Sequence, residues 1–237
     1  MALPVDRYTN SDYLNKNPTW DSEDAPWKAN LILDILNEHN MHPSKVCEVG
    51  CGSGAVLSFL SHSLNDSDFI GYDISNSLHK FWDKLSGERI KFVFGDFNKI
   101  NNEYYDLLLL LDVVEHIQDP FNFLTTIINS SKKFIFIFPL DLSAVSVLRE
   151  VGLINQRRNV GHIHYFTKGI VLELLTETGF KIIAQKYSNA SFNLPNMKLK
   201  TKIASIPRYL LSLINKDFSA RLLGGQTLIV LAEKKGD

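Results

Sequence analysis

This chain of 237 residues has few cysteines, little net charge and no long apolar run. Its two cysteines, Cys47 and Cys51, exclude a disulfide framework, so we expect a reduced, cytoplasmic setting. With a formal net charge of −1, the chain lacks the excess of basic residues that is typical of proteins that bind duplex nucleic acid, and no DNA partner is expected. The richest apolar stretch, Leu107–Leu111, is ended by Asp112 and is too short to span a bilayer. What is present is 45% hydrophobic residues, enough for one large core.

Strand-like and helix-like segments alternate from residue 45 onwards. We expect strands at 45–50, 68–74, 89–97, 104–114, 132–140, 180–187 and 226–234. Helices are expected from residue 24 to the proline at 43, at 55–62 and 77–85, from residue 120, and between 167 and 179. Residues 1–23 show no regular pattern. Such alternation predicts an α/β fold, a doubly wound parallel sheet with helices on both faces. A ligand is then expected at the carboxyl ends of the strands.

Glycines and carboxylates follow several of these strands. Gly50, Gly52 and Gly54 form a turn between the first strand and its helix, where a ligand can approach the backbone closely. Asp73 and Asp96 end the second and third strands, and Asp112 ends the fourth. A carboxylate can accept hydrogen bonds from ribose hydroxyls or from an exocyclic amine. Glu48 beside the turn repels a pyrophosphate and suits an ammonium or sulfonium. The pattern therefore favours a cationic adenosine compound.

The segments VCEVGCGSG, IGYDIS, FGDF, YDLLLLLDVVEHIQDP and FIFIFPL, in this order, resemble the motifs of class I S-adenosylmethionine-dependent methyltransferases. The resemblance covers residues 45–187 and 226–234, and it implies a seven-stranded sheet whose last strand runs antiparallel. DVVEHIQDP and GHIHYFT further resemble the small-molecule O-methyltransferase branch. The resemblance implies S-adenosylmethionine as cofactor. The implied cofactor-binding residues are Glu48, Gly50, Cys51, Gly52, Gly54, Asp73, Ile74, Asp96, Phe97, Leu111 and Asp112.

On this basis residues 1–237 are interpreted as one methyltransferase domain. Its parts are an N-terminal lid and helix (1–44), a cofactor-binding core (45–188), a helical insertion (189–224) and the last strand and tail (225–237). Residues 181–221 hold eight basic residues and one acidic residue. In the insertion, Pro207 is expected to divide an amphipathic helix. We favour a cap packed on the core, with a substrate lid, a homodimer surface and a membrane-surface helix as alternatives.

The segment Asp112-x-x-Glu115-His116 permits two interpretations. If it is helical, its two carboxylates and imidazole share one face and could hold a divalent ion, with His162 and His164 as further ligands. Relatives with E-x-x-E-H here, including small-RNA 3′-end methyltransferases, use such a metal. We favour the metal-free interpretation, because this motif also occurs in metal-free relatives. An RNA substrate is disfavoured by the net charge and by aspartate at position 112.

His162 and His164 lie in the long connection after the fifth strand, on the same side of it if it is extended. An imidazole suits removal of a proton from the acceptor, so His162, His164 and His116 are the candidate catalytic residues. We expect methyl transfer to a small molecule, to oxygen in particular. The sequence lacks the [DN]-P-P-[YF] motif of nucleic-acid amino methyltransferases. Two further alternatives are a nicotinamide-dependent oxidoreductase, which shares the G-x-G-x-x-A spacing, and a cofactor-binding subunit without activity.

Overall fold

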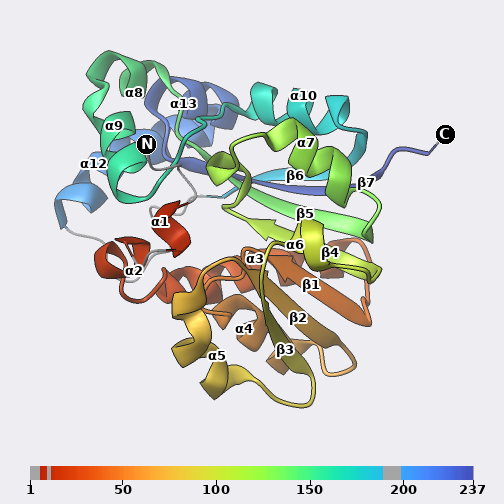
Figure 1. Ribbon diagram of the computed structural model, residues 1–237. Helices are drawn as coiled ribbons and strands as arrows, with labels where there is room; N and C mark the ends of the chain where they lie inside the picture. Colours follow the sequence, from red (N-terminus) through yellow and green to blue (C-terminus); the bar gives the residue numbers. More distant parts are fainter. Residues whose placement is uncertain (1–5, 10–11, 189–198, 237) are drawn as a thin grey trace.

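Seven strands form one sheet in the order β3-β2-β1-β4-β5-β7-β6. The computed structural model describes residues 6–9, 12–188 and 199–236 (Figure 1). The strands are β1 (Lys45–Val49), β2 (Asp68–Asp73), β3 (Ile90–Phe94), β4 (Tyr105–Leu111), β5 (Ser131–Leu140), β6 (Phe180–Ser188) and β7 (Gln226–Lys234). Neighbouring strands pair in parallel, except that β7 is antiparallel to both β5 and β6. The predicted α/β sheet with an antiparallel last strand is confirmed.

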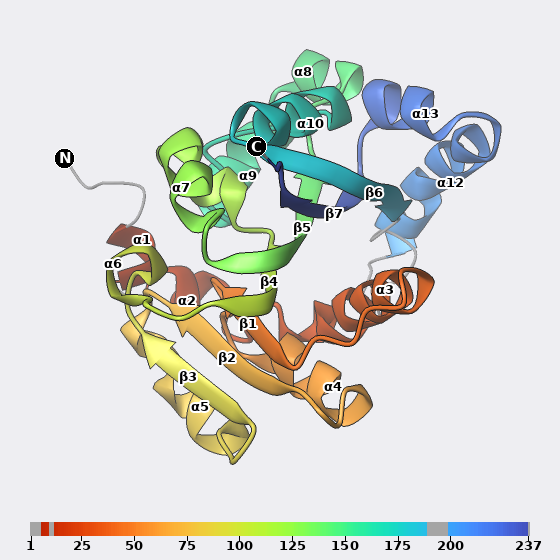
Figure 2. The same ribbon diagram turned by 90° about the vertical axis from the view of Figure 1, so that its right-hand side faces the viewer.

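Helices cover both faces of this sheet (Figure 2). Helix α3 (Ala25–Glu38) precedes β1, and the helices that connect successive strands include α4 (Ala55–Ser63), α5 (His79–Leu85), α6 (Phe97–Ile100), α7 (Pro120–Ile127) and α10 (Lys168–Glu177). Helices α3 and α4 pack on one face, and α7 and α10 pack on the other. The remaining helices are α1 (Asp6–Thr9), α2 (Asp12–Lys16), α8 (Ala144–Arg149), α9 (Val151–Asn159), α12 (Leu199–Ile214) and α13 (Lys216–Leu223).

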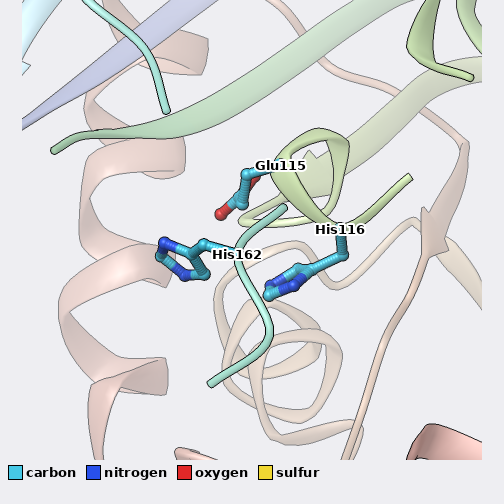
Figure 3. A group of neighbouring side chains, drawn as sticks. All are labelled: Glu115, His116 and His162. Atoms are coloured by element: carbon cyan, nitrogen blue, oxygen red, sulfur yellow. The ribbon is translucent and has the colours of Figure 1, made fainter. Parts of the chain in front are cut away.

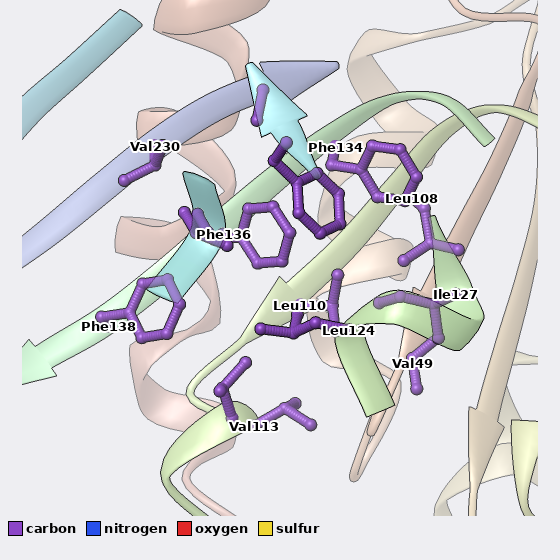
Figure 4. Close-up of a cluster of buried hydrophobic side chains, with 14 of the residues drawn as sticks. Val49, Leu108, Leu110, Val113, Leu124, Ile127, Phe134, Phe136, Phe138 and Val230 are labelled. Atoms are coloured by element: carbon purple, nitrogen blue, oxygen red, sulfur yellow. The ribbon is translucent and has the colours of Figure 1, made fainter. Parts of the chain in front are cut away.

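The central strands are buried on both faces, which explains their continuous apolar sequences. Along β4, Leu108 and Leu110 point into the cluster under α7 and α10, whereas Leu107 and Leu109 point into the cluster under α3 and α4. Figure 4 shows the first cluster, with Phe134, Phe136, Phe138, Leu124 and Ile127. This rigid double-sided core holds the carboxyl ends of the strands in register, and the polar residues that follow them are therefore positioned together.

Two local expectations are wrong. Residues 1–23 contain regular structure: α1 and α2 precede a 3₁₀ turn at Ser22–Asp24. The amphipathic spacing that would reveal such helices is absent, because each is only one turn long. In the insertion, α12 continues through Pro207. The packing of α12 on α13 accounts for this, since tertiary contacts can outweigh one lost backbone hydrogen bond. No helix in the described ranges is long and apolar enough to cross a membrane.

Candidate functional site

A cavity of about 670 Å³ lies at the carboxyl ends of the central strands. The turn after β1, the end of β2 and the segment after β4 form its floor, with Pro139 of β5 and Thr227 of β7 at one side. Tyr8, Tyr13 and Trp20, from the N-terminal segment, form the wall opposite the sheet. Tyr13 packs on both other rings, with centroids 5.2 Å from Tyr8 and 4.7 Å from Trp20. This is the edge where strand alternation predicts a ligand.

The glycine turn between β1 and α4 has a conformation that side chains would prevent. Gly50 has φ +71°, and a Cβ there would lie 2.7 Å from Val113 Cγ2. Gly54 has φ +78°, and a Cβ there would lie 2.4 Å from the Phe92 ring. Gly50 lines the cavity, as do Cys51 and Gly52, but Gly54 is not among the described lining residues. The α-carbon of Gly54 packs against Phe92, which gives this glycine a packing role in the turn.

Asp73, at the end of β2, is held by backbone donors on both carboxylate oxygens. Gly52 N donates to Oδ2 and Ser75 N donates to Oδ1, each at 2.9 Å. The side chain is buried yet lines the cavity. Burial raises the pKa of Asp73 to about 6, although these backbone hydrogen bonds oppose the shift. The carboxylate is thus fixed in direction and aimed at the cavity, where it can accept hydrogen bonds from a ligand.

Glu48, Lys28 and Asp112 form a charged group at the other end of the glycine turn. Lys28 Nζ, from α3, lies 2.7 Å from Asp112 Oδ2, and Asp112 is held in the left-handed region at φ +56°. Burial disfavours the Lys28 ammonium, but Asp112, Asp24 and Glu48 together hold its pKa above the ordinary lysine value. Glu48 is buried and its Oε2 has no hydrogen-bond partner among the described residues. The group offers both a cation and carboxylates, the requirement for binding a zwitterion.

The ionisation of Glu48 should reduce the stability of the unliganded protein. Burial raises the pKa of Glu48 to about 8, with Lys28 opposing the shift. Because this folded-state pKa exceeds that of the unfolded chain, stability from neutral Glu48 is lost as the pH rises through this range. We expect Glu48→Gln to gain stability over the wild type as the pH rises from about 5 to about 8.5. Urea unfolding across this pH range measures the free energy of unfolding of both proteins. A difference between them that does not change with pH would contradict the raised pKa of Glu48.

Four further lining residues combine apolar and polar groups that suit a nucleobase. These residues of the cavity lining are Ile74, Asp96, Phe97 and Leu111. Asp96 Oδ1 accepts from Asn98 N at 3.1 Å and so begins α6, while Lys99 Nζ lies 3.3 Å from Asp96 Oδ2. Its carboxylate therefore has a structural role at the helix start as well as a place in the cavity.

Two histidines that line the cavity, His116 and His162, lie next to a buried glutamate, Glu115. Figure 3 shows Glu115, His116 and His162 pointing toward one another, and one ligand atom of each lies within 4.8 Å of the others. Burial, with Asp112 next, raises the pKa of Glu115 well above its usual range. Neither of its carboxylate oxygens has a hydrogen-bond partner in the described part of the chain. Burial lowers the pKa of His116 to about 4, and His162 adds to this shift.

Each of these imidazoles is oriented through one ring nitrogen. Asp141 Oδ2 lies 2.7 Å from His162 Nδ1, and Gln156 Nε2 donates to the other Asp141 oxygen at 2.9 Å. Tyr8 Oη lies 2.8 Å from His116 Nδ1 and donates to Val160 O at 3.2 Å. The contact with Asp141 leaves Nε2 of His162 available, whereas the backbone of Gly161 also hydrogen-bonds to the His116 imidazole. Both histidines line the cavity. The rings are 5.0 Å apart between centroids.

The expected grouping of side chains after β4 needs two corrections. Asp112 does not share a ligand face with Glu115 and His116, because its left-handed backbone directs it to Lys28, and only Val114–His116 form a 3₁₀ turn. His164 is not among the described residues that line the cavity. Its Nε2 lies 2.9 Å from Ile117 O. His162 and His164 therefore have different environments, although both follow α9.

Sequence reasoning missed several residues of the site. Lys28 lies in the helix expected from residue 24, and Asp141 directly follows the strand expected at 132–140; no sequence motif marks either position. Tyr8, Tyr13 and Trp20 were visible as aromatic residues in a polar segment. Aromatic side chains in a polar segment indicate that the segment packs against another part of the protein, because their large apolar rings are stabilised by burial. The sequence does not indicate which part that is.

Comparisons with known proteins agree with this geometry. Residues 20–185 match the family described as methyltransferase domain. A ubiquinone biosynthesis O-methyltransferase of Rickettsia canadensis is 21% identical over 175 residues, 66% of this chain and 72% of that protein. The plantazolicin methyltransferase BpumL, solved in complex with a monoazolic desmethylPZN analogue and SAH, is similar with a TM-score of 0.64. It is 17% identical, and the match covers 99% of this chain and 95% of the other.

A second solved structure shares the fold. The magnesium protoporphyrin IX methyltransferase of Synechocystis PCC 6803, with bound SAH, has a TM-score of 0.59 and 16% identity. The match covers 89% of this chain and 83% of that protein.

Proposed function

Because the chain belongs to the class I S-adenosylmethionine-dependent methyltransferases, we propose that it transfers a methyl group to an oxygen of a small-molecule acceptor. The observation that carries the proposal is a single cavity that is lined by Asp73, by the glycine turn and by His162. Such a cavity holds a donor and an acceptor side by side. S-adenosylmethionine supplies an electrophilic methyl group on a sulfonium. The methyltransferase match replaces the nicotinamide-dependent alternative.

The residues around the glycine turn fit this cofactor. Asp73 would accept from the ribose hydroxyls, and Asp96 with Phe97 would contact the adenine. Glu48, whose Oε2 is buried and unpartnered among the described residues, would face the cationic end of the cofactor. Lys28 would exchange Asp112 for the carboxylate of the methionine part, which frees Asp112 for its ammonium. Glu48, Lys28 and Asp112 would each meet an opposite charge in the ligand, so binding would offset their burial.

His162 would remove the proton of the acceptor hydroxyl. Asp141 accepts from Nδ1, which directs the lone pair of Nε2 into the cavity and stabilises the imidazolium once it forms. His116 is a poor base at neutral pH, because burial lowers its pKa to about 4. Tyr8 and His116 would therefore position the acceptor, and the aromatic wall would exclude water.

A metal-assisted form of the same transfer is a second candidate, favoured by one observation. Glu115, His116 and His162 offer a carboxylate and two imidazoles within 4.8 Å. Asp141 and Tyr8 hold the remote nitrogens, the usual arrangement around metal-bound histidines. The set fits a divalent ion such as Fe²⁺, Zn²⁺ or Mn²⁺ by donor type. Metal analysis of protein purified without chelator separates the candidates: a stoichiometric ion, absent from Glu115→Gln, would establish the second.

Cofactor choice is tested most directly by thermal shift. We expect S-adenosylhomocysteine to raise the melting temperature, because a ligand that binds only the folded state stabilises it by mass action. NAD at the same concentration should produce no shift, since Glu48 beside the glycine turn disfavours a pyrophosphate there. A shift with NAD but none with S-adenosylhomocysteine would contradict the cofactor assignment.

A further inference from the structure

Four neighbouring helices expose large apolar side chains to solvent. These are Val147, Leu148, Val151, Tyr209, Leu210, Leu213, Ile214 and Phe218, called here the apolar face. Within the described residues, the four most exposed large apolar side chains all belong to it: Leu148 at 85%, Ile214 at 83%, Leu213 at 65% and Val151 at 64%. Helices α8, α9, α12 and α13 lie together at one side of the molecule (Figures 1 and 2), with α13 packed against both α8 and α12.

The last turns of α12 expose their apolar side chains to solvent, whereas a helix that only packs on the core would bury them. Leu210 and Ile214 are one turn apart and exposed, as are Tyr209 and Leu213, whereas Ser212 is 6% exposed. In α13 the buried residues are Ser219 and Ala220, and Ser219 Oγ donates to Arg208 O at 3.0 Å. The favoured sequence interpretation, an amphipathic cap whose apolar face is covered by the core, does not describe these turns. An exposed apolar patch of this kind marks an interaction surface.

Basic residues accompany the apolar face. Residues 144–159 and 207–223 contain six lysines and arginines and two acidic residues. One of the acids, Asp217, is already engaged by Lys168 and by the Tyr187 hydroxyl. Arg149 and Arg208 are close enough that Arg149 helps to lower the pKa of Arg208, after burial. The surface therefore carries an excess of positive charge in a protein with a net charge of −1.

We propose that this apolar face docks on an anionic lipid surface. Exposed leucine and isoleucine side chains on helices with flanking arginines and lysines are the composition of interfacial helices, in which apolar groups enter the acyl boundary and cations meet headgroup phosphates. A second copy is a poorer occupant, since a two-fold interface would place the same basic residues opposite one another. Val160, which follows α9 directly, lines the cavity, so the docked face adjoins one wall of the site.

The experiment is sedimentation of the full chain with vesicles. Wild-type protein is mixed with vesicles of phosphatidylcholine alone and of phosphatidylcholine with phosphatidylglycerol in equal parts. We expect binding to the anionic vesicles and a loss of that binding at high salt, which screens the charge contribution. Leu213→Ser combined with Ile214→Ser should lower the partition coefficient at least about tenfold, since two exposed apolar side chains no longer enter the bilayer.

Tyr104→Ser is the matched control, because Tyr104 is 59% exposed and lies outside the four helices. It should bind like the wild type, and the melting temperature of each variant shows that the fold is kept. Equal binding to neutral and anionic vesicles, no binding to either, or an equal loss in Tyr104→Ser would overturn the proposal. So would a wild-type dimer that dissociates in the Leu213/Ile214 variant, because the face would then be a subunit interface.

Discussion

Asp73→Ala should weaken the binding of S-adenosylhomocysteine at least about tenfold. The expected loss is ~1.5–3 kcal/mol for each hydrogen bond to a charged acceptor, and ~1.4 kcal/mol corresponds to a factor of ten in affinity. The carboxylate is already aligned by the amides of Gly52 and Ser75, so a ligand gains its hydrogen bonds without reorganising the side chain. Calorimetric titration of folded variant and wild type measures the change.

Two comparisons separate a ligand contact from a loop effect. Asp68→Ala removes an exposed aspartate at the opposite end of the same strand and should leave the affinity unchanged. Asp73→Asn keeps one carbonyl oxygen toward the backbone amides and should fall between alanine and wild type. Unchanged affinity in a folded Asp73→Ala variant would remove Asp73 from the cofactor site.

His162→Gln should lower turnover by ~10²–10⁴-fold, the range that a positioned general base contributes. Affinity for S-adenosylhomocysteine should stay within about twofold, because His162 is not among the residues proposed to bind the cofactor. The assay first requires an acceptor, found by screening phenols, catechols and hydroxy acids for uptake of a labelled methyl group. Single-turnover rates with that acceptor then isolate the chemical step.

His164→Gln is the matched control for this experiment, since His164 bonds to Ile117 O and is not among the described lining residues. Its turnover per folded molecule should remain close to that of the wild type. Asp141→Asn should reproduce much of the His162→Gln defect, because the wrong tautomer of His162 would then be favoured. Full activity in His162→Gln would exclude it as the base. A bound ion lost in both His162→Gln and Glu115→Gln would instead indicate the metal-assisted form.

The parts of the site that the sequence predicts are those that belong to single strand ends. Glu48, Gly50 and Asp73 each follow a short apolar run, and parallel strands bring such ends to one edge whatever the loops do. Apolar alternation and glycine spacing are local properties, so the α/β fold class could be expected before any coordinate was known. The antiparallel β7 was implied by the family resemblance, and the strand order came from the structure. The family resemblance was decided by the same local motifs.

Only the tertiary structure decided which polar groups face each other across the cavity. Lys28 pairs with Asp112, Tyr8 with His116, and Asp141 with His162, over sequence separations as large as 108 residues. No periodicity encodes such pairs, because they depend on how α1, α3 and the segment after β5 pack over the sheet. The left-handed backbone at Asp112 separated it from Glu115, and the turn after α9 separated His162 from His164. The sequence alone therefore determined the scaffold and the cofactor edge, whereas packing decided the acid–base and ionic partners, since their energies come from burial and distance.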